Sequence, residues 1–228
     1  TDITSLVTVT AVTGTVEGRT GHDGRPAKEI STILVPAGTE GFSVAKAYDK
    51  VGWNSSDTHA LHFSDVRVPE ENLLGARGRG FANFLEILDE GRIAIAALAT
   101  GAAQGCVDES VAYAKQRTSF GQKIGQFQAV SFKIARMQAR AHAARLAYYE
   151  AAQKMLAGKP FKTEAAMAKL IAGEAAMDNA RDATQVFGGY GFMNEYRVSR
   201  HYRDSKILEI GEGTTEVQLM LIARGLGL

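Results

Sequence analysis

The 228-residue sequence contains one cysteine, one tryptophan and four prolines. A single thiol cannot form an internal disulfide, which excludes the small disulfide-stapled class of secreted domains. Cys106 stands among small residues, so we expect a buried structural thiol rather than a reactive one. The cysteine content fits a reducing, cytoplasmic setting.

The sequence also lacks long apolar runs and a surplus of either charge. No stretch reaches the ~18 apolar residues that span a bilayer, and no charged-then-apolar signal segment opens the chain. Lys and Arg number 26 against 25 Asp and Glu, so the chain has no basic footprint for nucleic acid or anionic lipid. We therefore expect neither nucleic acid nor a membrane as a partner.

Several catalytic and ligand-binding motifs are absent. The five histidines are scattered without metal-ligand spacing, so no metal site is predicted. Residues 75–80 (GARGRG) are rich in glycine but lack the order and the βαβ frame of a dinucleotide fingerprint, and a hinge is the better interpretation. No Gly-x-Ser-x-Gly motif supports serine hydrolysis.

Residues 1–75 carry the pattern of an antiparallel β domain. Four short runs rich in β-branched and aromatic residues are separated by glycines and Pro26, which we interpret as turns. The expected strands are 6–12, 30–35, 42–44 and 59–68. This segment therefore predicts part of an antiparallel β-barrel or sandwich. Because the first strand has almost no lead-in, we expect the chain to be a piece of a longer polypeptide.

Residues 76–228 change to helical periodicity with alanine-rich stretches. The expected helices are 78–116, 127–156, 163–187, 197–210 and 215–226, with Thr163 and Thr214 as N-caps. Long helices joined by short loops indicate an antiparallel bundle. The fold class is therefore α+β in segregated domains, with the β domain at 1–75 and the helical bundle at 76–228.

Three stretches between helices carry residues suited to chemistry. Residues 117–122 (RTSFGQ) put a cation, two hydroxyls and an aromatic in one turn, which suits a pyrophosphate beside a flat ring or simply a helix end. Residues 185–191 (QVFGGYG) form a glycine turn that a ligand could approach, although a helix stop is the simpler interpretation. Glu212 lies between two glycines, and spacing alone favours a sharp turn over catalysis.

Several motifs resemble the acyl-CoA dehydrogenase family, in the family's order and over essentially the whole chain. They lie at residues 50–58, 63–75, 117–121, 126–129, 185–191, 202–206 and 212–214. Members of this family have an N-terminal helical domain, a middle β domain and a C-terminal helical bundle. The chain resembles part of the middle domain and the whole C-terminal one, so we expect it alone to bind FAD weakly and turn over little.

The resemblance implies a catalytic role for Glu212 as the base that removes a proton next to the thioester carbonyl, with its backbone amide polarising the thioester oxygen. Some members carry the base on the first long helix, where this chain has Gly91. The positions that match acyl-CoA contacts are Asp89, Arg92 and Gly213. The positions that match FAD contacts are Arg117, Thr118, Ser119, Phe127, Gln128, Gln185, Val186, Phe187, Gly188, Gly189, Thr214, Thr215 and Glu216.

The resemblance further implies a flavoprotein oxidoreductase of fatty acid metabolism. It would oxidise an acyl-CoA to a trans-2-enoyl-CoA, pass electrons to an electron-transferring flavoprotein and assemble as a homotetramer. Alternatives are an acyl-CoA oxidase, which uses oxygen, and a non-catalytic helical assembly module. The chain departs from several relatives at Gly211, where they have Tyr, and at Pro160 and Lys162, where some have Arg and Thr.

Overall fold

The computed structural model describes residues 4–21 and 23–228 of the chain. The chain divides into two compact units, one formed by Thr1–Lys50 and Asn54–Ile87 and the other by Val51–Trp53 and Leu88–Leu228. Within the described residues, no helix is long and apolar enough to cross a membrane. The boundary expected at residue 75, between the β domain and the helical bundle, stays a prediction.

The first unit contains short antiparallel sheets. β1 (Leu6–Thr20) pairs with β2 (Pro26–Pro36), and β2 pairs in turn with β5 (Leu73–Leu74) behind the 3₁₀ turn η1 (Glu70–Asn72). β3 (Phe42–Val44) and β4 (Leu61–Phe63) form a separate two-stranded ladder.

The first unit differs in several respects from the fold that the sequence predicted. Across the described residues the strands are antiparallel as expected, but they close no barrel. β1 runs on past the glycines that we interpreted as turns, because register shifts after Val12 and Thr15 absorb the irregularity. The run expected at 59–68 forms a strand only at Leu61–Phe63.

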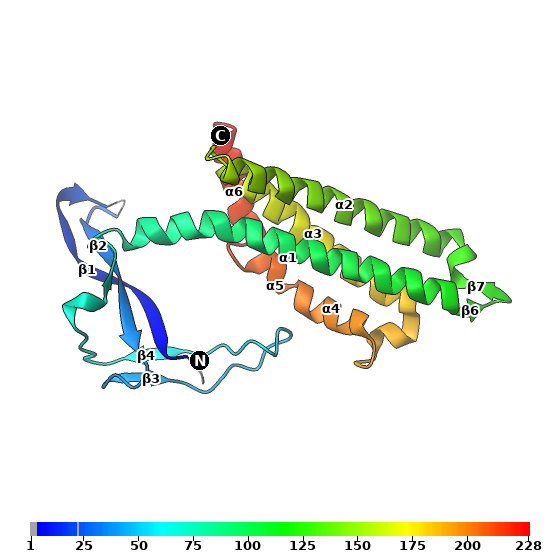
Figure 1. The fold of residues 1–228 in the computed structure, drawn as a ribbon, viewed down its shortest axis with the longest axis horizontal. Coiled ribbons are helices and arrows are strands. Elements are labelled where there is room, and N and C mark those ends of the chain that lie inside the picture. The colour runs from blue at the N-terminus through cyan, green and yellow to red at the C-terminus, as the bar shows by residue number, and fades with distance from the viewer. Residues whose placement is uncertain (1–3, 22) are drawn as a thin grey trace. The chain divides into compact units, whose positions relative to one another are not determined.

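The second unit is helical and built on long, alanine-rich elements. α1 (Gly80–Gln116), which begins in the first unit, α2 (Gln128–Leu156) and α3 (Lys162–Phe187) run side by side in Figure 1. Fully buried alanines from all three helices form much of the core, because a methyl side chain favours helix and lets helices approach closely. These three helices confirm the predicted spans to within two residues.

Shorter elements complete the helical unit. The hairpin β6 (Thr118–Ser119) and β7 (Gln122–Lys123) and the turn η2 (Ile124–Gln126) join α1 to α2, and η3 (Gly188–Phe192) follows α3. α4 (Arg197–Ser205), α5 (Ile207–Ile210) and α6 (Thr215–Gly225) form the C-terminal part.

Two helix predictions need correction. The helix expected at 197–210 is divided at Lys206, where the Glu209 amide donates to the Lys206 carbonyl three residues back and tightens the turn. α3 begins at Lys162 behind Phe161, and Thr163 is not its N-cap. The Thr163 side chain instead packs against Gly225, where an added Cβ would be 2.7 Å from Oγ1.

Candidate active site

Glu212 lies on the turn between α5 and α6 in a conformation unusual for its residue type. The Gly211 amide closes α5 by donating to the Ile207 carbonyl at 2.7 Å. Glu212 then takes a φ of 56° and Gly213 a φ of 95°, and Thr214 begins α6 from the N-cap position. The left-handed region costs a residue with a Cβ about 1 kcal/mol or more, and such strain is typical of functional sites.

Gly213 is required for this turn by both its backbone and its surroundings. A Cβ there would be 2.8 Å from the Gln218 Nε2 atom and 3.2 Å from the Val217 side chain. The φ of 95° is also one that glycine adopts most readily. The glycine on the C-terminal side of Glu212 is therefore fixed by close packing.

The side chain of Glu212 is half-buried against α1. A Cβ added to Gly91 would be 2.6 Å from the Glu212 Oε2 atom and 3.0 Å from its carboxyl carbon. The structure thus brings together the two positions that the sequence analysis compared as sites for a base. Gly91 leaves the space that the Glu212 carboxylate fills.

Two buried side chains hold the backbone of this turn. The Lys169 ammonium on α3 donates to the carbonyls of Glu209 at 2.9 Å and Gly213 at 2.8 Å. The Gln218 amide on α6 donates to the carbonyls of Glu212 at 3.2 Å and Gly213 at 2.9 Å. Sequence analysis missed both residues. The signal available for Lys169 was a lysine within the alanine-rich apolar run of α3.

Asp89 and Arg92 lie near this turn on the same helix as Gly91. Arg92 is 4% exposed and forms an ion pair with Asp89, three residues earlier on α1. Arg92 is therefore not a solvated surface charge, and a buried guanidinium is uncommon. Its Nε atom is a buried donor with no hydrogen-bond partner within the described residues, which is uncommon in folded proteins.

The residues expected to contact pyrophosphate and flavin near Arg117 gather around a cavity at the opposite end of the unit. The cavity has a volume of about 620 Å³ and is lined by Tyr113, Arg117, Ser119, Ile124, Val186, Phe187, Gly188, Gly189, Tyr190 and Met193. The Arg117 guanidinium lies 5.7 Å from the centre of the Tyr190 ring. Its wall therefore presents a cation, a hydroxyl and aromatic faces.

The glycine turn after α3 borders this cavity and a second one. Gly188 has a φ of 60°, and a Cβ added to Gly188 or Gly189 would meet no atom within 4 Å. Gln185 and Gly188 line a second cavity of about 760 Å³, with Arg181 and Arg203 among its other residues. Open space over two adjacent glycines allows close approach of a ligand to the backbone.

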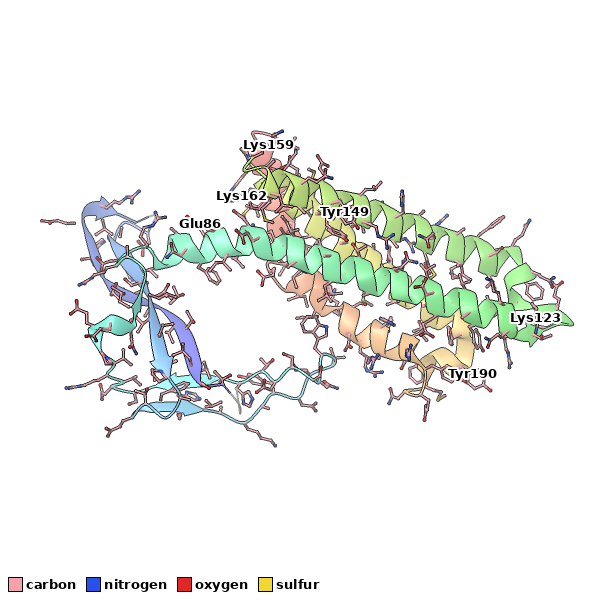
Figure 2. All side chains as sticks on the ribbon, in the orientation of Figure 1. Glu86, Lys123, Tyr149, Lys159, Lys162 and Tyr190 are labelled. Carbon is pink, nitrogen blue, oxygen red and sulfur yellow. The ribbon has the colours of Figure 1, made fainter. Side chains whose placement is uncertain are left out.

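The predicted cofactor residues fall into two groups at the two ends of the helical unit. Figure 1 places the β6–β7 hairpin at one end and α6 at the other, and Figure 2 shows Tyr190 at the first end and Lys162 at the second. Phe127 and Gln128 belong with the first group, at the start of α2. Thr214, Thr215 and Glu216 belong with Glu212 at the start of α6.

The distance between the two groups can be estimated along α3. Lys169 donates to the Gly213 carbonyl, next to the group at the start of α6, and Phe187 lines the cavity of the other group. They are 187 − 169 = 18 residues apart on α3, about 27 Å at 1.5 Å per residue. The ring system of a single flavin therefore cannot contact both groups of predicted cofactor residues within one copy of the chain.

Comparisons with known proteins agree on one family. The model of the acyl-CoA dehydrogenase C-terminal domain matches residues 78–227. A probable acyl-CoA dehydrogenase of Bacillus subtilis is 48% identical over 220 residues, which are 96% of this chain and 56% of the relative.

Solved structures give the same result. Butyryl-CoA dehydrogenase from Megasphaera elsdenii superposes with a TM-score of 0.89 at 43% identity, covering 98% of this chain and 56% of that one. The FAD complex of PigA superposes with a TM-score of 0.90 at 31% identity, covering 100% and 57%. The chain thus spans about half the length of the relatives that it matches. The family model, the identities and the shared fold show that this chain belongs to the acyl-CoA dehydrogenase family.

Proposed function

We propose that the protein containing this chain is an FAD-dependent acyl-CoA dehydrogenase in which Glu212 is the catalytic base. The observation that carries the proposal is the placement of Glu212. Its carboxylate fills the space beside Gly91, while its backbone lies in the left-handed region and is followed by two hydrogen-bonded carbonyls, its own and that of Gly213. A strained, backbone-anchored carboxylate on an open turn is suited to general base chemistry.

The proposed reaction forms a carbon–carbon double bond next to a thioester. The Glu212 carboxylate takes the proton as the Cα–H bond breaks, and the hydride leaves Cβ with its bonding electrons. FAD, when bound, supplies the two-electron acceptor for that hydride. The Glu212 backbone amide donates to the thioester oxygen, where negative charge develops as the proton leaves. Asp89, Arg92 and Gly213 border the acyl-CoA in this proposal.

The residues present fit FAD at both ends of the unit. The 620 Å³ cavity offers the Arg117 guanidinium and the Ser119 hydroxyl for a pyrophosphate, beside the open backbone at Gly188 and Gly189. The group at the start of α6 would contact the flavin that serves Glu212. Because about 27 Å separates the groups along α3, we propose that they serve different FAD molecules in a homotetramer.

The proposed electron acceptor is an electron-transferring flavoprotein, in a cytoplasmic pathway of fatty acid metabolism. The alternative is an acyl-CoA oxidase, which would share Glu212 and the flavin residues but reduce oxygen. Assays with butyryl-CoA, run without oxygen with and without an acceptor protein and then repeated in air, separate them. Turnover that requires an added acceptor protein supports the dehydrogenase, whereas turnover with oxygen alone and hydrogen peroxide release supports the oxidase.

The central test is Glu212→Gln in the full-length protein. General base catalysis contributes roughly 10²- to 10⁴-fold, so we expect flavin reduction by butyryl-CoA to slow by at least about 100-fold. The thermal midpoint should change little, because glutamine is nearly isosteric. Glu90→Gln, an exposed neighbour of Gly91, is the matched control and should reduce flavin normally. Unchanged reduction in Glu212→Gln would overturn Glu212 as the base, whereas a wild-type protein whose flavin butyryl-CoA does not reduce would favour the assembly module.

A further inference from the structure

Two buried polar side chains, Lys169 and Gln218, hold the turn that carries Glu212. Apolar packing of the core does not explain why these two polar groups are buried. Lys169 is 1% exposed among the buried alanines of α3, and Gln218 on α6 is fully buried. Removing an ammonium or an amide from water is unfavourable unless its donors are satisfied. Each side chain donates two hydrogen bonds to backbone carbonyls of residues 209–213.

Three of the four hydrogen bonds converge on the two peptide groups that follow Glu212. The Gly213 carbonyl accepts from both Lys169 and Gln218, and the Glu212 carbonyl accepts from Gln218. Fixing these two carbonyls fixes the rotations on the C-terminal side of Glu212 and through Gly213. The fourth bond, from Lys169 to the Glu209 carbonyl, anchors the helix that leads into the turn.

α3 supports the same turn one helical turn further along. Gly173 follows Lys169 by four residues and therefore lies on the same face of α3. A Cβ on Gly173 would be 2.8 Å from the Leu208 carbonyl oxygen, so α5 lies directly against the α3 backbone. The base is thus bounded by Gly91 of α1 on its carboxylate side and by α3 on its backbone side.

Charge near Lys169 is consistent with a positioning role rather than a reactive one. Burial is the main cause that lowers the pKa of the Lys169 ammonium, with Arg92 acting in the same direction. Glu209, Glu212 and Glu216 oppose this shift. Because its ammonium is almost inaccessible and donates to two carbonyls, Lys169 cannot itself reach a substrate.

We propose that Lys169 and Gln218 form a clamp that positions Glu212 for proton abstraction without touching the substrate. The inference rests on the proposed function, since it assigns the clamp to the same reaction. Loss of either donor frees the two peptide groups to rotate, and the carboxylate then no longer keeps its place beside Gly91. Proton abstraction should suffer more than acyl-CoA binding, because a misplacement of about 1 Å can cost 100-fold in rate.

The test uses the full-length holoenzyme with Lys169→Met and Gln218→Met, which keep an unbranched chain of similar length and remove the donors. The probe is acetyl-CoA, which has exchangeable α-hydrogens but no β-carbon from which hydride could leave. Deuterium uptake from heavy water, followed by mass spectrometry, then reports proton abstraction alone. We expect each variant to exchange about 10- to 100-fold more slowly, with a dissociation constant for butyryl-CoA within about threefold of the wild type.

Controls separate positioning from general damage. Lys46→Met and Gln153→Met make the same chemical changes at exposed positions and should exchange at the wild-type rate. FAD content and thermal midpoint are measured for every variant, and exchange is followed well below each midpoint. If Lys169→Met does not fold, Gln218→Met still decides the matter. A variant that binds FAD and exchanges at the wild-type rate overturns the clamp.

Glu212→Gln in the same exchange assay distinguishes the two proposals. If Glu212→Gln exchanges normally, the base itself is wrong. If Glu212→Gln stops exchange while both methionine variants leave it unchanged, the base stands and the clamp fails. An increased α-deuterium isotope effect on turnover of butyryl-CoA in the methionine variants is the expected kinetic signature, because proton abstraction becomes more rate-limiting.

Discussion

Gly91 lies on α1 and Glu212 on the turn between α5 and α6, and each accounts for the other. The half-buried Glu212 carboxylate lies where a side chain on Gly91 would have to be. At the scale of single residues, the site therefore depends on a missing Cβ as much as on the carboxylate. The same holds at Gly213, where a Cβ would collide with Gln218.

Gly91→Ala tests this complementarity. The new Cβ would be 2.6 Å from Oε2, and an ordinary contact begins at 3.4 Å, so the carboxylate must move by about 0.8 Å. We expect flavin reduction by butyryl-CoA in the full-length protein to slow by about 10- to 100-fold. Stopped-flow absorbance of the flavin provides the measurement.

Gly101→Ala is the matched control, because it makes the same change on α1 where an added Cβ meets no atom within 4 Å. Both substitutions should raise helix propensity by about 1 kcal/mol, so neither is expected to unfold the helix. Equal reduction rates in the two variants would contradict the proposed contact between Gly91 and the base.

At the scale of elements, α3 organises the helical unit. Its buried face carries Lys169 and Gly173 beneath the turn that holds Glu212, and Asn179 at the junction of three helices. The Asn179 amide donates to the Ala103 carbonyl of α1 at 3.1 Å and to the Met137 carbonyl of α2 at 2.9 Å. One fully buried side chain thus links all three long helices.

Asn179→Leu is expected to destabilise the helical unit by about 2 kcal/mol. Leucine keeps a similar volume, so the loss comes mainly from the two buried hydrogen bonds at about 1 kcal/mol each, with a smaller part from the 3.3 Å bond that Arg140 donates to the Asn179 Oδ1 atom. Urea unfolding followed by circular dichroism measures the change. Asp178→Asn, on the same helix in partly exposed ion pairs with Arg140 and Arg181, should change stability by less than about 1 kcal/mol. Equal stability of the two variants would argue against the three-helix link.

At the scale of the whole molecule, the folded core makes the single thiol a contributor to pH-dependent stability. Cys106 is fully buried, and burial raises its pKa to about 12, with a smaller contribution from Glu109. Because the folded-state pKa lies above the unfolded value of 9.0, the folded chain holds this proton more tightly. The stabilisation is complete below pH 9 and is lost as the pH rises toward 12.

Comparison with Cys106→Ala isolates this effect from other titrating groups. Between pH 8 and pH 10, the stability difference between the wild type and Cys106→Ala should fall by about 1 kcal/mol. Urea unfolding at both pH values measures the difference. A difference that stays constant would show that the thiol ionises as readily in the folded protein as in the unfolded chain.

The predictions from sequence succeeded where the signal is local. Helical periodicity and alanine content gave α1, α2 and α3 to within two residues, because these properties act over neighbouring turns. They failed where pairing decides the structure: β1 continues through Gly14 and Gly18, and the two-residue strands β5, β6 and β7 were missed. Short strands exist through their partners, and local composition does not specify them.

The sequence by itself determined the helical elements, the glycines around Glu212 and the motifs that mark the family, since each lies within a short stretch of chain. Only the tertiary structure decided that Glu212 faces Gly91, that Arg92 is buried, and that Lys169 and Gln218 hold the turn. These contacts join residues far apart in the chain. They depend on helix packing, which side-chain spacing along one helix does not reveal.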